Sequence, residues 1–113
     1  MRRVFICGPL SNGGTLGGKY VEANVHVAMS AATDLEKAGL AVFCDPLVRY
    51  YLCQRDSTHC QYAEASSCEW IRASDAMLRL RGECAEADRL VKYAVTINKP
   101  IYHKVAEVLE ALR

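Results

Sequence analysis

Apolar and polar positions follow two alternating patterns along the first half of the chain. Arg3-Val-Phe-Ile-Cys7 is a short apolar run rich in β-branched and aromatic residues, which predicts a buried strand. From Tyr20 to Lys37, apolar residues recur at steps of three and four, which predicts an amphipathic helix that stops at Gly39. A second apolar run, Leu40–Cys44, predicts another strand. Because a strand, a helix and a strand follow in this order, we expect a right-handed βαβ unit with parallel strands.

The second half of the chain continues the alternation with shorter elements. Residues 47–62 show neither period and are interpreted as a long loop with room for one helical turn. The alternation predicts one α/β domain over residues 1–113, with a three-layer Rossmann-like (flavodoxin-like) sandwich and a parallel sheet of four to five strands. The further elements are strands over residues 76–80 and 101–102 and helices over residues 63–73, 87–97 and 105–112.

The composition agrees with a globular domain and excludes some classes of partner. Of 113 residues, 51% are hydrophobic and 24% are charged, which suffices for a core. The net charge of +1 gives no basic field for a phosphate backbone, so we expect no nucleic acid polymer as a partner. No segment approaches the roughly 20 apolar residues that cross a bilayer, and the apolar run after Met1-Arg2-Arg3 is too short for a signal peptide. We therefore expect a cytoplasmic protein without a membrane partner.

The six cysteines are interpreted as reduced thiols. Cys7 and Cys44 fall within predicted strands, where they fit as small core residues. No pair has the Cys-x-x-Cys spacing that is typical of a zinc site, so we do not expect zinc. One cluster could still hold zinc, and its members are Cys53, His59, Cys60 and Cys68.

Three predicted loops leave the carboxyl ends of the strands, where α/β sheets bind ligands. They span Gly8–Gly18, Asp45 to about Gln61, and Arg81–Glu86, and we expect the first and third to flank a crevice. The first holds five glycines and a proline in eleven residues, so its backbone N–H groups can approach a phosphate or a sugar. The same composition also fits a plain flexible turn. The candidate binding residues here are Gly8, Pro9, Leu10, Ser11, Asn12, Gly14 and Tyr20.

Carboxylates gather in the third loop, at the start of a predicted helix. Glu83, Glu86 and Asp88 lie within six residues. Carboxylates at this position stabilise a helix N-terminus by about 0.3–1 kcal/mol each, and one of them could instead act as nucleophile or general acid on a sugar bond. The residues alone leave both interpretations open. Gly82 and Cys84 in the same loop are further candidates for ligand binding.

Several short motifs occur in a fixed order along nearly the whole chain. In the first half they are Phe5-Ile-Cys-Gly-Pro-Leu-Ser11, Asn24, Gly39-Leu-Ala-Val-Phe43 and Pro46. In the second half they are Glu69-Trp70, Ser74-Asp75-Ala76, Leu78-Arg-Leu-Arg-Gly-Glu83, Ala87-Asp-Arg89 and Lys99-Pro-Ile-Tyr102. Their order and spacing resemble the nucleoside 2-deoxyribosyltransferase superfamily, and most closely its small DUF4406 branch.

The resemblance implies a Rossmann-like fold that forms homo-oligomers and binds a small nucleoside or nucleotide. Characterised members of the superfamily cleave or exchange the N-glycosidic bond of deoxynucleosides or deoxynucleotides without metal or diffusible cofactor. A glutamate attacks C1′ to form a glycosyl-enzyme, which a base or water then resolves. In its nucleotide hydrolases, the first glycine loop and a serine of the later loop hold the 5′-phosphate.

The chain departs from the branch in the loop that carries this chemistry. The usual run Gly-Glu-Ser-x-Gly-Ala-Asp-Arg-Glu-Val reads Gly82-Glu-Cys-Ala-Glu-Ala-Asp-Arg-Leu-Val91 here. Leu90 therefore occupies the position of the nucleophilic glutamate, Cys84 that of the serine and Glu86 that of the glycine. Leucine can neither attack C1′ nor stabilise an oxocarbenium ion.

Neighbouring carboxylates are the candidates to replace the missing nucleophile. Glu86 precedes Leu90 by one helical turn and shares its face, whereas Asp88 is expected to point away. One hypothesis is therefore an N-glycosidic-bond hydrolase or deoxyribosyltransferase, with Glu86 or Glu83 as nucleophile and Asp75 as a supporting acid. The alternative is a catalytically silent binding module for a nucleotide-like ligand, such as a sensor or sequestering protein. A third hypothesis is a structural homo-oligomer without a ligand.

Overall fold

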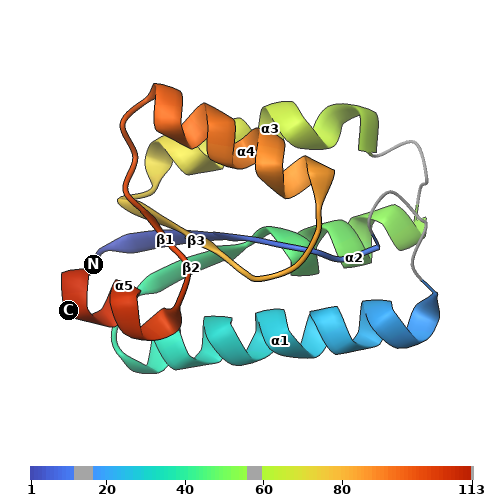
Figure 1. Ribbon diagram of the computed structural model, residues 1–113, viewed down its shortest axis with the longest axis horizontal. Coiled ribbons are helices and arrows are strands. Elements are labelled where there is room, and N and C mark those ends of the chain that lie inside the picture. Colours follow the sequence, from blue (N-terminus) through green and yellow to red (C-terminus); the bar gives the residue numbers. More distant parts are fainter. Residues whose placement is uncertain (12–16, 56–59, 113) are drawn as a thin grey trace.

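A parallel β-sheet lies between two layers of helices (Figure 1), so the predicted α/β fold is confirmed. The computed structural model describes residues 1–11, 17–55 and 60–112, which contain four strands and five helices. None of these helices combines the length and the apolar character needed to cross a membrane. The strands are β1 (Arg3–Cys7), β2 (Ala41–Cys44), β3 (Ala76–Arg79) and β4 (Ile101–Tyr102). The helices are α1 (Gly18–Lys37), α2 (Asp45–Arg55), α3 (Cys60–Ala73), α4 (Ala85–Thr96) and α5 (Val105–Leu112).

The strand order reverses next to the central strand β1. The strands lie in the order β2-β1-β3-β4, and every neighbouring pair is parallel. The chain therefore leaves β1 toward one side to form β2, and returns past β1 to form β3 on the other side. In open α/β sheets, ligands bind outside the carboxyl ends of the strands at such a reversal. In this protein that place lies between the ends of β1 and β3.

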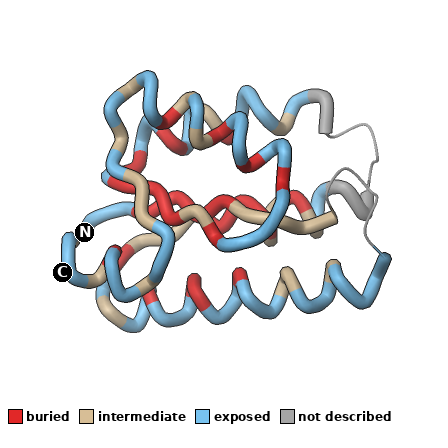
Figure 2. Tube along the Cα trace, viewed as in Figure 1, coloured by how far each residue is buried: buried red, intermediate tan, exposed pale blue. Residues whose placement is uncertain are grey.

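Alternate residues of the central strand face different helical layers. Val4 and Ile6 pack with residues of α1 and α5, whereas Phe5 and Cys7 pack with residues of α3 and α4. All four side chains are fully buried, and Figure 2 shows the buried segments concentrated between the helical layers. Because both faces of the sheet are covered, the strands read as continuous apolar runs in the sequence.

Two predicted helix stops coincide with residues in the left-handed conformation. Gly39, with a φ of +90°, follows the end of α1, and Leu40 donates its N–H to the Leu35 carbonyl at 3.1 Å. Asn98, with a φ of 58°, follows the end of α4. Each stop directs the chain into the strand that follows, β2 or β4.

The segment interpreted as a long loop over residues 47–62 is largely helical, so that prediction is wrong. α2 begins directly at Asp45-Pro46, and α3 begins at Cys60. Proline fits the first turn of a helix, where its missing N–H has no intrahelical partner, and an aspartate there suits the helix dipole. The apolar pattern did not reveal α2 because one of its buried side chains is charged: Arg49 is 6% exposed and pairs with Asp45 one turn earlier.

We predict that the buried thiols of Cys7 and Cys44 react more slowly with a thiol reagent than the half-buried thiol of Cys68. Burial raises the pKa of the Cys7 thiol to about 12 and that of Cys44 to about 11, so both remain protonated at about pH 8. In the folded protein, iodoacetamide at this pH should modify the half-buried Cys68 faster than Cys7 or Cys44, as measured by peptide mass mapping. The same reaction in urea is the control and should remove the difference. Equal rates in the folded protein would contradict the burial of the two strand cysteines.

Candidate functional site

The loops that follow β1 and β3 touch each other at the point where the strand order reverses. Leu80 donates its N–H to the Cys7 carbonyl at 2.8 Å, just beyond the end of β3. A Cβ atom on Gly8 would lie 2.7 Å from the Leu80 Cβ. A Cβ atom on Gly82 would lie 2.8 Å from the Pro9 Cγ. Glycine at these two positions therefore permits the close approach of the first and third loops, and the crevice expected between them stays a prediction.

A side chain of α1 ties down the start of the glycine-rich loop. Asn24 Nδ2 donates to the Leu10 carbonyl oxygen at 2.9 Å. α1 then begins after Gly17, which forms no side-chain cap, so no N-cap side chain competes with a ligand for the first N–H groups of the helix. Of the other candidates in and after this loop, Ser11 is half-buried, Tyr20 is exposed, and Asn12 and Gly14 lie outside the described residues.

Arg79 determines the shape of the loop after β3. Its Nη2 atom donates to the Gly82 carbonyl at 2.9 Å and to Asp88 Oδ1 at 3.1 Å. Its Nη1 atom donates to the Leu80 carbonyl. The side chain of Arg79 is only 12% exposed, whereas that of Asp88 is 70% exposed. Asp88, one of the predicted acids, therefore partners an arginine that holds the loop against the sheet.

The other candidate site residues of this loop, Glu83, Cys84 and Glu86, lie at the start of α4. Cys84 is the N-cap residue: it is 5% exposed, and its Sγ accepts the Ala87 N–H at 3.4 Å. Glu83 and Glu86 are exposed at the same helix end, where the helix dipole favours carboxylates. The structure thus gives Cys84 a capping role and places both glutamates at the surface near the proposed crevice.

Leu90, at the position of the nucleophilic glutamate in the resembled superfamily, is a core residue. It is 4% exposed and packs in a cluster that includes Phe5 and Met77 of the sheet. In the first turn of α4, Ala87 faces this cluster and is 2% exposed, whereas Glu86 is exposed. The buried face of α4 therefore passes through Ala87 and Leu90 and leaves Glu86 outside it.

Asp75 lies at the opposite edge of the sheet from the glycine-rich loop. It directly precedes β3, and its Oδ2 accepts the N–H of Arg3, the first residue of β1, at 2.7 Å. Because parallel strands begin at the same edge, the amino end of β3 cannot reach the carboxyl ends of its neighbours. The structure therefore does not bring Asp75 together with Glu83, Glu86 or Asp88, and gives it the role of satisfying the first donor of β1.

Three polar side chains lie in a row across the carboxyl edge of the sheet. Cys7 is in register with Arg79 of β3. On the other side, the pair Ile6–Cys44 places Asp45 next to Cys7. Burial dominates the raised pKa of Cys7, which the charge of Arg79 lowers and that of Asp45 raises further. A guanidinium and a carboxylate therefore flank the end of β1, where a ligand of this fold would lie.

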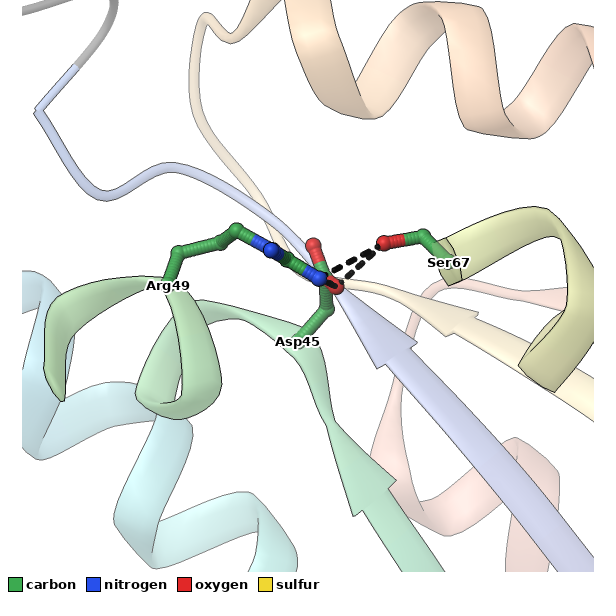
Figure 3. A network of polar contacts seen from close by, with 3 residues as sticks. All are labelled: Asp45, Arg49 and Ser67. Atoms are coloured by element: carbon green, nitrogen blue, oxygen red, sulfur yellow. Dashed lines mark hydrogen bonds and ion pairs between the residues drawn. The ribbon is translucent and has the colours of Figure 1, made fainter. Parts of the chain in front are cut away.

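Asp45 belongs to a buried polar network that the sequence analysis missed (Figure 3). Its Oδ1 accepts hydrogen bonds from Ser67 Oγ at 2.7 Å and from Arg49 Nε and Nη2, both at 3.3 Å. Arg49 Nη2 also donates to Ser67 Oγ at 3.1 Å. All three residues are buried, with exposures of 8% for Asp45, 6% for Arg49 and 1% for Ser67. In the sequence, the indication of this network was the spacing of four residues between Asp45 and Arg49, directly after a predicted strand.

The candidate zinc cluster is only partly described. Of its members, Cys68 is a half-buried free thiol, and the side chains of Cys53, His59 and Cys60 lie outside the described residues. Within the described part of the chain, no three His, Cys, Asp or Glu side chains come together in a way that could hold a metal ion.

Comparisons with protein-family models, with curated proteins and with solved structures find no significant match to this chain.

We predict that the contact between the two loops makes Gly82 intolerant of a side chain. Gly82 has a φ of +128°, and its Cβ would press on Pro9, so Gly82→Ala should lower the free energy of unfolding by about 1–3 kcal/mol, measured by urea denaturation. Gly17→Ala is the matched control, because apart from its chain neighbours no atom of the described residues lies within 4 Å of its Cβ position, and it should change stability by less than about 0.5 kcal/mol. Equal stability of the two variants would show that the loops do not touch.

We also predict that position 90 does not tolerate a glutamate, the residue that the resembled superfamily carries there. Leu90→Glu would bury an unpaired carboxylate in an apolar cluster and should lower the free energy of unfolding by about 3 kcal/mol or more. Leu90→Met nearly conserves volume and should cost less than about 1.5 kcal/mol. If Leu90→Glu proves as stable as the wild type in urea denaturation, then side chain 90 reaches solvent and the core assignment fails.

Proposed function

We propose that this chain is a nucleoside- or nucleotide-binding protein related to the nucleoside 2-deoxyribosyltransferase superfamily. The ligand lies at the carboxyl edge of the sheet, between the loops that follow β1 and β3. The observation that carries the proposal is the contact of these loops at the strand-order reversal, made through Gly8 and Gly82. The order of motifs along the chain supports the choice of a nucleoside as the ligand.

The chemistry of this edge suits a ligand with both polar and charged groups. The glycine-rich loop leads into α1 without a side-chain cap, and backbone N–H groups at a helix N-terminus favour phosphate or hydroxyl oxygens. Arg79 and Asp45 flank the end of β1 with opposite charges. The edge therefore offers donors on the side of β3 and an acceptor on the side of β2.

Binding is favoured over bond cleavage by the residues that replace the superfamily's catalytic ones. Leu90 is packed in the core, and Asp88 is paired with Arg79. Asp75, the expected supporting acid, lies at the far edge of the sheet. The proposed role is therefore that of a catalytically silent module that senses or sequesters its ligand, and the resemblance further implies a homo-oligomer that needs no cofactor.

A second candidate function is an N-glycosidic-bond hydrolase or deoxyribosyltransferase. One observation favours it: Glu86 is exposed at the start of α4, one turn before Leu90 and next to the loop that contacts Gly8. In this mechanism the Glu86 carboxylate attacks C1′ of the sugar and the base leaves with the bond electrons. Water or a second base then displaces Glu86 from the glycosyl ester.

A panel of 2′-deoxynucleosides and their 5′-monophosphates tests both functions in one experiment. Binding is measured as a rise in melting temperature, and a ligand at 100 times its dissociation constant should stabilise the protein by about 2.7 kcal/mol. Chromatography of the same mixtures after long incubation measures free base. We expect stabilisation without base release, and release by the wild type that Glu86→Gln abolishes would establish the second function instead.

Two variants test whether the ligand binds at the carboxyl edge of the sheet. Arg79→Met removes the group that shapes the loop after β3 and should weaken binding at least about tenfold. Asp75→Asn, at the opposite edge, should bind as the wild type does. If no member of the panel stabilises the protein, the proposal that it binds nucleosides or nucleotides is wrong.

A further inference from the structure

Asp45 is a carboxylate that is almost removed from water at the ligand-facing edge of the sheet. The residue is 8% exposed and directly follows β2. Its Oδ1 accepts all three hydrogen bonds that Ser67 and Arg49 donate to the carboxylate (Figure 3). Contacts from α2 and α3 therefore hold this carboxylate in one orientation.

The second oxygen of the same carboxylate has no such contacts. The hydrogen bonds that described residues donate to this carboxylate all end on Oδ1, and none ends on Oδ2. In the described part of the chain, every side-chain oxygen or nitrogen that is shut off from solvent has a hydrogen-bond partner. Oδ2 is consequently reachable from solvent, although most of the Asp45 side chain is buried.

The contact between Arg49 and Asp45 uses one carboxylate oxygen rather than two. Arginine matches a carboxylate best through two parallel hydrogen bonds, one to each oxygen. Both Arg49 nitrogens that contact Asp45 meet Oδ1 instead, at 3.3 Å each. The contact that holds the side chain therefore leaves an ionised acceptor available.

This acceptor lies beside the loops of the proposed site. Asp45 is next to Cys7 across the pairing of β1 with β2, and Cys7 is in register with Arg79 on the other side. A ligand held by the loops after β1 and β3 would meet Asp45 on its β2 side. A carboxylate forms strong hydrogen bonds with neutral donors and repels phosphate and carboxylate groups.

We infer that Asp45 is a specificity-determining residue whose Oδ2 accepts a hydrogen bond from a neutral donor of the ligand. The donor is a sugar hydroxyl or an exocyclic amino group of the base. The inference rests on the proposed function and narrows it, because it orients the ligand. The donor-bearing part of the nucleoside lies toward β2, and any phosphate lies on the side of Arg79 and Gly8.

The test compares the affinities of several nucleosides for the wild type and for an Asp45 variant, measured by isothermal titration calorimetry. The tightest-binding 2′-deoxynucleoside is compared with its 2′,3′-dideoxy and 5′-deoxy analogues, which each lack one sugar hydroxyl. A third analogue lacks a base amino group: deoxyinosine for the purines, deoxyuridine for deoxycytidine. In the wild type, one of these analogues should bind about tenfold more weakly than the parent nucleoside. That analogue identifies which donor Asp45 meets.

Asp45→Asn keeps the shape of the side chain and replaces its ionised acceptor with a neutral amide. This variant should bind the parent nucleoside about tenfold more weakly than the wild type does. It should bind the parent nucleoside and the analogue that lacks the donor with equal affinity. Asp75→Asn is the same substitution at the opposite edge and should keep the wild-type pattern. If circular dichroism shows that Asp45→Asn is unfolded, Asp45→Asn/Arg49→Gln replaces it, because removing both charges leaves neither buried alone.

The outcomes separate this inference from the function on which it rests. If nucleosides bind but Asp45→Asn binds all of them as the wild type does, Asp45 does not meet the ligand. An equal loss for the parent and every analogue overturns the inference as well, because it shows that Asp45 acts only through the fold. If no nucleoside binds the wild type, the proposed function itself is wrong, and so is the proposed role of Asp45.

Discussion

The pairing of β1 with a parallel neighbour on each side is the constraint on which the rest of the structure depends. Both faces and both edges of this strand are covered, so Val4 through Cys7 must be apolar and fully buried. Its first donor and its last acceptor are satisfied by residues that flank β3, Asp75 and Leu80. The same pairing brings the carboxyl ends of three strands to one edge, with helices leaving toward opposite faces. The position of the candidate site follows from this topology rather than from the sequence of any single loop.

Two arginines organise the polar groups at that edge. Arg79 ties the end of β3 to its loop and to α4, and Arg49 ties the end of β2 to α2 and, through Ser67, to α3. A buried ion pair adds little net stability, because the cost of removing two charges from water offsets much of their attraction. Their contribution is therefore better understood as geometric. Each holds one wall of the proposed crevice in place, and Arg49 does so while leaving one oxygen of Asp45 available.

The same helix, α4, meets competing requirements of packing and chemistry. Its buried face runs through Ala87 and Leu90 into the cluster around Phe5. A glutamate at position 90 would place a charge where this protein has an apolar contact, so leucine at this position strengthens the core. The carboxylates that remain, Glu83 and Glu86, lie at the surface of the helix end, where they stabilise the helix dipole without any ligand.

Local patterns predicted the strands, most of the helices and the helix ends at Gly39 and Asn98, because continuous apolar runs, a helical period of 3.6 residues and left-handed turns all involve neighbouring residues. The order of strands and helices also predicted that the loops after β1 and β3 leave the same edge of the sheet, because a βαβ order allows few topologies. The helices over residues 47–55 and 60–62, and the pairing of Asp45 with Arg49 and Ser67, became apparent from the three-dimensional structure alone. The physical reason is that a buried charge is tolerated only with its partner, and one of those partners lies on another helix, 22 residues away, where no local pattern records it.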